Sequence, residues 1–112
     1  MTILEEINNY KLEFVKRKAK DRPIKELKSS LKIDGTKNFL FSNKLFKNQE
    51  HTSFIGEIKR ASPSAGKIIE YNVDILDIVK KYEINSVSCL SILTDEKYFH
   101  GAHEDLINIK KN

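Results

Sequence analysis

The chain has 112 residues and a formal net charge of +4 at pH 7, and 39% of its residues are hydrophobic while 32% are charged. This composition is typical of a globular domain, and no run approaches the roughly 20 apolar residues that a membrane span needs. No secretory signal pattern is visible, so we expect a cytoplasmic location. The chain has a single cysteine, Cys89, which excludes a disulfide framework. We expect Cys89 to be a buried small hydrophobic side chain.

The positive charge is concentrated near the N-terminus. Residues 11–37 hold ten Lys or Arg against four Asp or Glu, whereas residues 38–112 hold ten of each kind. A solvated helix face explains such a segment, and a funnel for an anionic substrate or a contact with RNA are the alternatives. No aromatic stacking motif or Gly-rich RNA signature accompanies the charge.

The first predicted element is a helix that ends near Lys20. Thr2 and Glu5 have the spacing of a capping box, in which each residue bonds the other's backbone N–H. Apolar residues then recur at steps of four, three and four, which places one seam on a helix: Ile3, Ile7, Tyr10 and Phe14.

Two shorter helices are predicted next. Pro23 suits a first helical position, and helical spacing continues until Asp34-Gly35 imposes a turn, through Ile24, Leu27 and Leu31. Residues 39–46 are too densely apolar for a solvated loop, so we expect a third short helix that lies against something larger.

The remaining chain predicts a βαβ unit. Residues 53–58 and 86–93 are short apolar runs typical of strands buried on both faces, and a helix of about ten residues with Asp74 in its first turn separates them. A further helix begins near His103. Two parallel strands need others beside them, and residues 94–112 predict no third strand.

Glu57 and Lys59 are the first candidates for chemistry. They are two positions apart near the carboxyl end of the first strand, so their side chains leave the same face. Ligands of parallel sheets bind at the carboxyl ends of the strands, although an ordinary ion pair is the alternative. The segment 60–66 offers hydroxyls and backbone N–H groups that suit an anion, or it is a plain connection.

The run FIGEIKRASPSAG, residues 54–66, resembles the signature around the first barrel strand of indole-3-glycerol-phosphate synthases. The run LSILTDEKYFHG, residues 90–101, resembles the second strand and its loop at the family's spacing. The N-terminal helices resemble the family's extension over the barrel mouth, so the likeness covers the whole chain. Phosphoribosylanthranilate isomerase, a related barrel enzyme, lacks the first motif and the helical lead.

The resemblance implies an α/β fold, namely the first portion of a (β/α)8 TIM barrel. Residues 1–50 would form a helical extension, and residues 51–112 the first two βα units. It implies a decarboxylating ring closure of 1-(2-carboxyphenylamino)-1-deoxyribulose 5-phosphate to indole-3-glycerol phosphate, without cofactor or metal. The expected partners are this phosphorylated anilino-sugar and the remaining barrel strands or a fused pathway enzyme, with neither nucleic acid nor membrane.

The resemblance also implies roles for two catalytic residues. Lys59 would hold the anionic substrate and assist the condensation, and Glu57 would position Lys59 and the reacting centre. In the family, a general acid on the third strand, a general base on the fourth and a phosphate site on the last two strand loops complete the machinery. We therefore expect the 112 residues to be a truncated portion that is inactive by itself.

Four further residues are implied in substrate binding. Ser62 and Pro63 would line the carboxylate end of the substrate, Phe99 would supply an apolar wall for its aromatic ring, and Ser91 would add a polar contact. Ala65 stands where many relatives carry a lysine, so an anion contact there is not expected.

Tyr98 and His100 are interpreted as packed or solvated loop residues rather than acid–base groups, and His51 and His103 receive no role. The first alternative function is a non-catalytic basic module that binds RNA or another anionic partner. The second is one half of a split enzyme that a second polypeptide completes.

Overall fold

The computed structural model describes residues 1–31, 39–47 and 51–112. The chain forms two compact units, Met1–Asn38 and Phe39–Asn112. The turn predicted at Asp34-Gly35 lies outside the described residues. No helix in the described ranges combines the length and the apolar character that crossing a bilayer requires.

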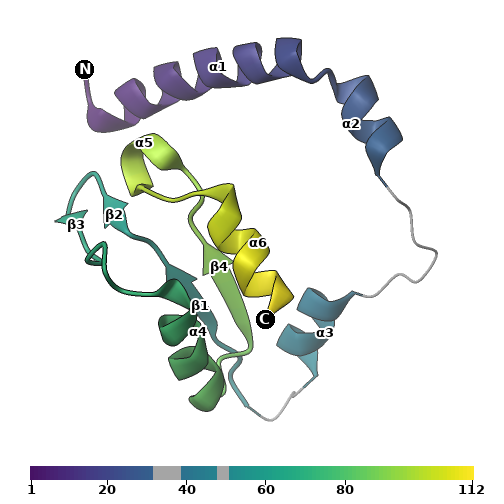
Figure 1. The fold of residues 1–112 in the computed structure, drawn as a ribbon, viewed down its shortest axis with the longest axis vertical. Helices are drawn as coiled ribbons and strands as arrows, with labels where there is room; N and C mark the ends of the chain where they lie inside the picture. The colour runs from purple at the N-terminus through teal and green to yellow at the C-terminus, as the bar shows by residue number, and fades with distance from the viewer. Residues whose placement is uncertain (32–38, 48–50) are drawn as a thin grey trace. The chain divides into compact units, whose positions relative to one another are not determined.

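The first unit consists of two helices. Helix α1 (Ile3–Asp21) begins at the predicted capping box: the hydroxyl of Thr2 accepts from the backbone N–H of Glu5 at 3.2 Å, and the N–H of Thr2 donates to the Glu5 carboxylate at 2.7 Å. Helix α2 (Ile24–Ser30) follows, with Pro23 at its N-cap rather than at the predicted first helical position. Both predicted helices are therefore confirmed (Figure 1).

The capping box predicts a measurable local effect. Thr2→Ala removes the hydroxyl acceptor and should cost about 1 kcal/mol of local helix stability. Amide hydrogen exchange in the first turn of α1, at Glu5 and Glu6, should speed up, whereas Thr2→Ser keeps the acceptor and should exchange like the parent. Unchanged exchange in Thr2→Ala would show that solvent replaces the cap.

The second unit is built on a parallel pair of strands. Strand β1 (Ile55–Ile58) pairs with β4 (Cys89–Ile92), and helix α4 (Ile75–Ile84) connects them, with Asp74 at its N-cap (Figure 1). This arrangement confirms the predicted βαβ unit. Helix α6 (His103–Lys111) follows, as predicted.

Helix α3 (Leu40–Phe46) belongs to this second unit and packs near the start of both strands. The hydroxyl of Ser53 donates to the backbone carbonyl of Leu45 at 2.7 Å, and the Cys89 thiol lies 3.7 Å from the carbonyl of Phe41. The prediction of a short helix against a larger element is confirmed. Cys89, predicted to be buried, is only half-buried.

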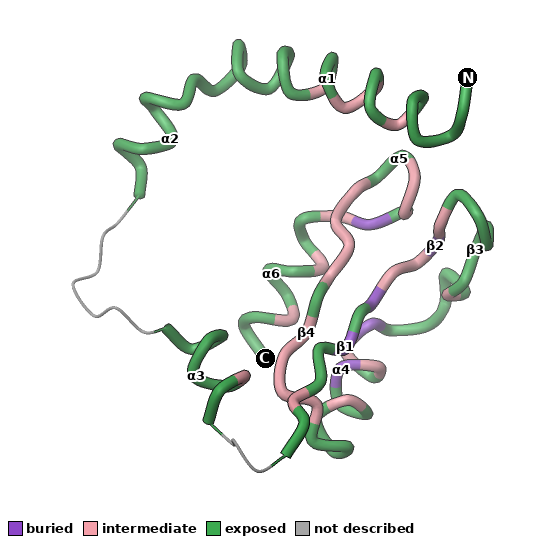
Figure 2. Tube along the Cα trace, turned by 180° about the vertical axis from the view of Figure 1, so that it is seen from behind, coloured by how far each residue is buried: buried purple, intermediate pink, exposed green. Residues whose placement is uncertain are grey.

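The core is small and lies on one face of the strand pair. Ile58, Ile75 and Val79 are buried there, and Leu90 and Ile92 of β4 pack against them. The opposite face carries Ile55, which is 52% exposed, and burial therefore alternates along β1 (Figure 2). The expectation that both faces of the strands are buried is wrong for these residues, because α4 covers one face only.

Candidate functional site

Glu57 and Lys59 form an ion pair at the carboxyl end of β1. The Lys59 ammonium lies 2.8 Å from the Glu57 carboxylate, and the two side chains are 38% and 48% exposed. They point away from α4, because the alternate residues Gly56 and Ile58 are the buried ones. The pair is thus open to solvent on the uncovered face of the sheet, where a ligand could reach both charges.

The backbone beneath this pair is held by α4. The phenol of Tyr82 donates to the carbonyl of Glu57 at 3.2 Å, and the Tyr82 ring lies 3.2 Å from where a Cβ on Gly56 would sit. A residue with a side chain at position 56 would therefore press on Tyr82 and Val87. The absence of a side chain at Gly56 lets the helix support the strand directly under Glu57.

Ser91 lies beside Glu57 on the neighbouring strand. The two residues are register partners in the parallel pair, so they share the uncovered face, and Ser91 is exposed. The ladder continues beyond the strand, where the N–H of Leu93 donates to the carbonyl of Ile58 at 3.0 Å. The structure therefore brings together Glu57, Lys59 and Ser91 at one end of the sheet.

Ser62 and Pro63 lie in a small hairpin that follows β1. Strands β2 (Ala61–Ser62) and β3 (Gly66–Lys67) pair antiparallel, and the carbonyl of Arg60 accepts from the N–H groups of residues 68 and 69 at 2.8 and 3.0 Å. The Ser62 hydroxyl accepts from the N–H of Ala65 at 3.1 Å and so holds the turn. The sequence predicted only a connecting segment after the strand, and the bonds to Arg60 make it a hairpin.

Phe99 lies in a one-turn helix, α5 (Glu96–Phe99), that the sequence did not predict. The carboxylate of Asp95 accepts from the N–H of Tyr98 at 2.8 Å and caps the turn, and His100 ends it in the left-handed conformation. Helix α5 contacts β2, so the half-buried Phe99 belongs to the segment beside Ser62.

Gly101 closes this segment against β4. It is buried, its N–H donates to the carbonyl of Asp95 at 2.8 Å, and a Cβ built on it would lie 2.0 Å from the carbonyl oxygen of Leu93. Only a residue without a side chain fits, which fixes the course of the chain after Phe99.

Arg60 and Asp105 form a second ion pair that sequence reasoning missed. The guanidinium donates through two nitrogens to the two carboxylate oxygens at 3.1 and 3.4 Å, and the side chains are only 22% and 17% exposed. The residues are 45 positions apart, and no periodic pattern links them. The only signal in the sequence is the place of Arg60 directly after Lys59.

The candidate residues thus form two sets in their polar contacts. Glu57 and Lys59 bond each other, whereas the Ser62 hydroxyl bonds within its own turn. Tyr98 has Lys97 against its ring, and His51, His100 and His103 are exposed. Among the described residues, no group of three His, Cys, Asp or Glu side chains is arranged to hold a metal ion.

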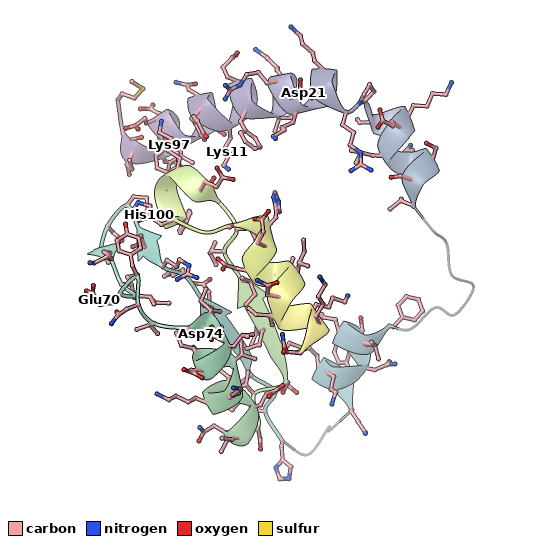
Figure 3. All side chains as sticks on the ribbon, viewed as in Figure 1. Lys11, Asp21, Glu70, Asp74, Lys97 and His100 are labelled. Carbon is pink, nitrogen blue, oxygen red and sulfur yellow. The ribbon has the colours of Figure 1, made fainter. Side chains whose placement is uncertain are left out.

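The carboxyl-end site is open rather than enclosed. A hollow of about 1130 Å³ lies instead toward the starts of the two strands, where Phe54, Ser88 and Lys44 are among its lining residues. Figure 3 labels Glu70, whose carboxylate pairs with the Lys67 ammonium at 2.7 Å, and Asp74, whose carboxylate accepts from the N–H of Leu76 at the start of α4. A substrate held at Lys59 would need further walls.

Comparison with known protein families gives a match over residues 4–112 to the model described as indole-3-glycerol phosphate synthase. An indole-3-glycerol phosphate synthase of Caldanaerobacter subterraneus subsp. tengcongensis is 40% identical over 97% of this chain and 40% of its own length. A chloroplastic indole-3-glycerol phosphate synthase of Arabidopsis thaliana is 38% identical over 96% of this chain and 27% of its own length.

A third relative is the tryptophan biosynthesis protein TrpCF of Buchnera aphidicola subsp. Diuraphis noxia. It is 42% identical over 96% of this chain and 22% of its own length. The chain therefore spans between about a fifth and two fifths of the length of these three relatives.

Proposed function

This chain belongs to the indole-3-glycerol phosphate synthase family, and we propose that it supplies the substrate-gripping part of such a synthase. The reaction is the ring closure of 1-(2-carboxyphenylamino)-1-deoxyribulose 5-phosphate, with loss of carbon dioxide and water, to indole-3-glycerol phosphate. This carbon–carbon lyase step belongs to tryptophan biosynthesis. The observation that carries the proposal is the Glu57–Lys59 pair, 2.8 Å apart on an uncovered strand face within the family motif.

Lys59 would act on the charged substrate. Its ammonium is a compact cation with three donors, and it is 38% exposed, so it can exchange part of its contact with Glu57 for a carboxylate or a developing oxyanion. Glu57 would hold the ammonium over the strand end when no substrate is bound. Two residues on one face, two positions apart, therefore provide an anion grip that is already oriented.

The binding residues would act around this grip. The Ser62 hydroxyl accepts from Ala65 to hold the hairpin turn and lies 3.4 Å from the hydroxyl of Ser64, and Pro63 stiffens the exposed tip. Together they suit the carboxylate end of the substrate. Phe99 would face the aromatic ring, and Ser91, next to Glu57, would add a polar contact.

We propose that residues 51–112 are the first βαβα portion of a (β/α)8 barrel and that residues 1–50 are its helical extension. Two features support this fold. Among the described residues of the second unit, no helix covers the face that carries Glu57, and Ile55 on the same face is 52% exposed. Further parallel strands would enclose that face, as the greater length of the relatives allows.

The chemistry would be shared between this portion and the rest of the barrel. Ring closure needs a proton donor at the carbonyl oxygen and an acceptor at the ring carbon, and Lys59 with Glu57 supplies a grip rather than both groups. As the family resemblance implies, the acid and the base would lie on the third and fourth strands. The TrpCF relative makes a fused or associated pathway enzyme a reasonable partner, and we propose the cytoplasm as the compartment.

Complementation tests the proposal. A polypeptide of residues 1–112 should form no measurable indole-3-glycerol phosphate by itself, because the acid and base are missing. Mixing it with the later strands of the Caldanaerobacter relative should restore turnover, detected by the ultraviolet fluorescence of the indole product. The later strands alone are the control. Robust turnover by residues 1–112 alone would overturn the division of labour, and a folded but inactive mixture would count against the function.

A further inference from the structure

We propose that Arg60 and Asp105 are positioning residues that set the hairpin of residues 61–67 against the segment that carries Phe99. This inference rests on the proposed function, because Ser62, Pro63 and Phe99 are assigned there to the substrate. It concerns a different pair of residues from Glu57 and Lys59, which would hold the anionic substrate. Both side chains of the pair are less than a quarter exposed, whereas those of Lys59 and Glu57 are 38% and 48% exposed.

Arg60 contacts two separate parts of the chain, one through its backbone and one through its side chain. Its backbone carbonyl accepts from the N–H groups of Ile68 and Ile69 and so closes the base of the hairpin. Its side chain leaves in another direction and meets Asp105 in the first turn of α6. The residue before it is Lys59 and the residue after it is the buried Ala61. One residue therefore connects the grip, the hairpin and α6.

Asp105 holds the segment that carries Phe99. The segment from Asp95 to α6 is held to β4 by Gly101, whose backbone lies against the carbonyl of Leu93. Four positions later, Asp105 ties the same segment to the end of β1. Phe99 lies between Asp95 and Gly101, so its place relative to Ser62 depends on attachments to both strands.

The chemistry of the pair suits positioning better than general stabilisation. A guanidinium that donates two bonds to one carboxylate fixes direction as well as distance, and a lysine could not reproduce the fork. Exposed ion pairs such as Lys80–Asp77, at 3.8 Å and about 70% exposure, lack this geometry. Asp105 also lies near the N-terminus of α6, where the helix favours a negative charge.

The first test uses residues 1–112 and does not need activity. Asp105→Asn and Arg60→Lys should each speed amide exchange on both sides of the tie, at Ile68 and Ile69 and also at Gly101, by about tenfold. Glu104→Gln, an exposed neighbour on α6, is the matched control and should leave both sites unchanged. Circular dichroism checks that each variant is folded. Faster exchange on one side only, or on neither, would overturn the inference.

The second test uses the complemented enzyme. Asp105→Asn should raise KM about tenfold while kcat changes less than about threefold, because misplaced binding loops weaken substrate and transition state alike. Asp105→Glu keeps the carboxylate and should recover most of the KM. A loss confined to kcat, or a KM equal to that of the parent, would contradict positioning. An inactive parent mixture would instead reject the proposed function and leave the exchange result to decide the inference.

Discussion

Replacing Gly101 with alanine is expected to lower the free energy of unfolding of the second unit by about 3 kcal/mol or more. The added Cβ would lie 2.0 Å from the carbonyl oxygen of Leu93 and 3.0 Å from the Cα of Thr94. Both atoms belong to the backbone, so no side-chain rotation can relieve the overlap. The backbone at residue 101 would have to move away from β4, and this movement would break the hydrogen bond that the Gly101 N–H donates to the carbonyl of Asp95.

Gly66→Ala is the matched comparison. Gly66 has a φ of +66°, so alanine is strained there, but its Cβ would meet nothing within 4 Å. The expected loss is about 1 kcal/mol, from backbone conformation alone. Urea unfolding followed by circular dichroism measures both variants. If Gly101→Ala proves no more harmful than Gly66→Ala, the segment after Phe99 has room that the structure does not show.

The elements that the sequence predicted well carry their signals locally. Helix α1 follows from its capping box and its apolar seam. Helix α4 follows from Asp74 and from apolar residues at helical spacing, namely Ile75, Leu76, Val79 and Tyr82. The parallel pairing follows from two apolar runs with a helix between them, because a crossover of that length permits it. The proximity of Glu57 and Lys59 could be predicted for the same reason, since the period of a strand places both side chains on one face.

The elements that the sequence did not predict depend on bonds to distant or single groups. The hairpin at residues 61–67 exists because one carbonyl, that of Arg60, accepts two N–H groups, and α5 is one turn held by Asp95. Neither is long enough to show a periodic pattern. The contact of Arg60 with Asp105 joins residues 45 positions apart in the sequence. The exposure of Ile55 depends on which face of the strand pair α4 covers. Such features require the folded arrangement.

The final prediction concerns Lys59 in the complemented enzyme. Lys59→Met keeps the length of the side chain and removes its charge, so kcat/KM should fall about 10³-fold, the order expected when a preorganised cation at developing negative charge is lost. Lys59→Arg keeps the charge but spreads it over a planar fork, and should recover only part of the activity. Glu57→Gln should cost less than Lys59→Met, because Glu57 acts by holding the ammonium at 2.8 Å.

Lys80→Met is the matched control, since Lys80 is an exposed lysine on α4 that pairs with Asp77 at 3.8 Å. It should leave kcat/KM within about twofold of the parent, because a solvated surface charge contributes little to a distant site. Steady-state rates at several substrate concentrations separate the outcomes. More than a tenth of the parent's kcat/KM in Lys59→Met would show that the ion pair at the end of β1 is structural. A large loss in that variant, with Lys80→Met intact, assigns the cation to the substrate, because the two replacements remove the same charge from the same unit.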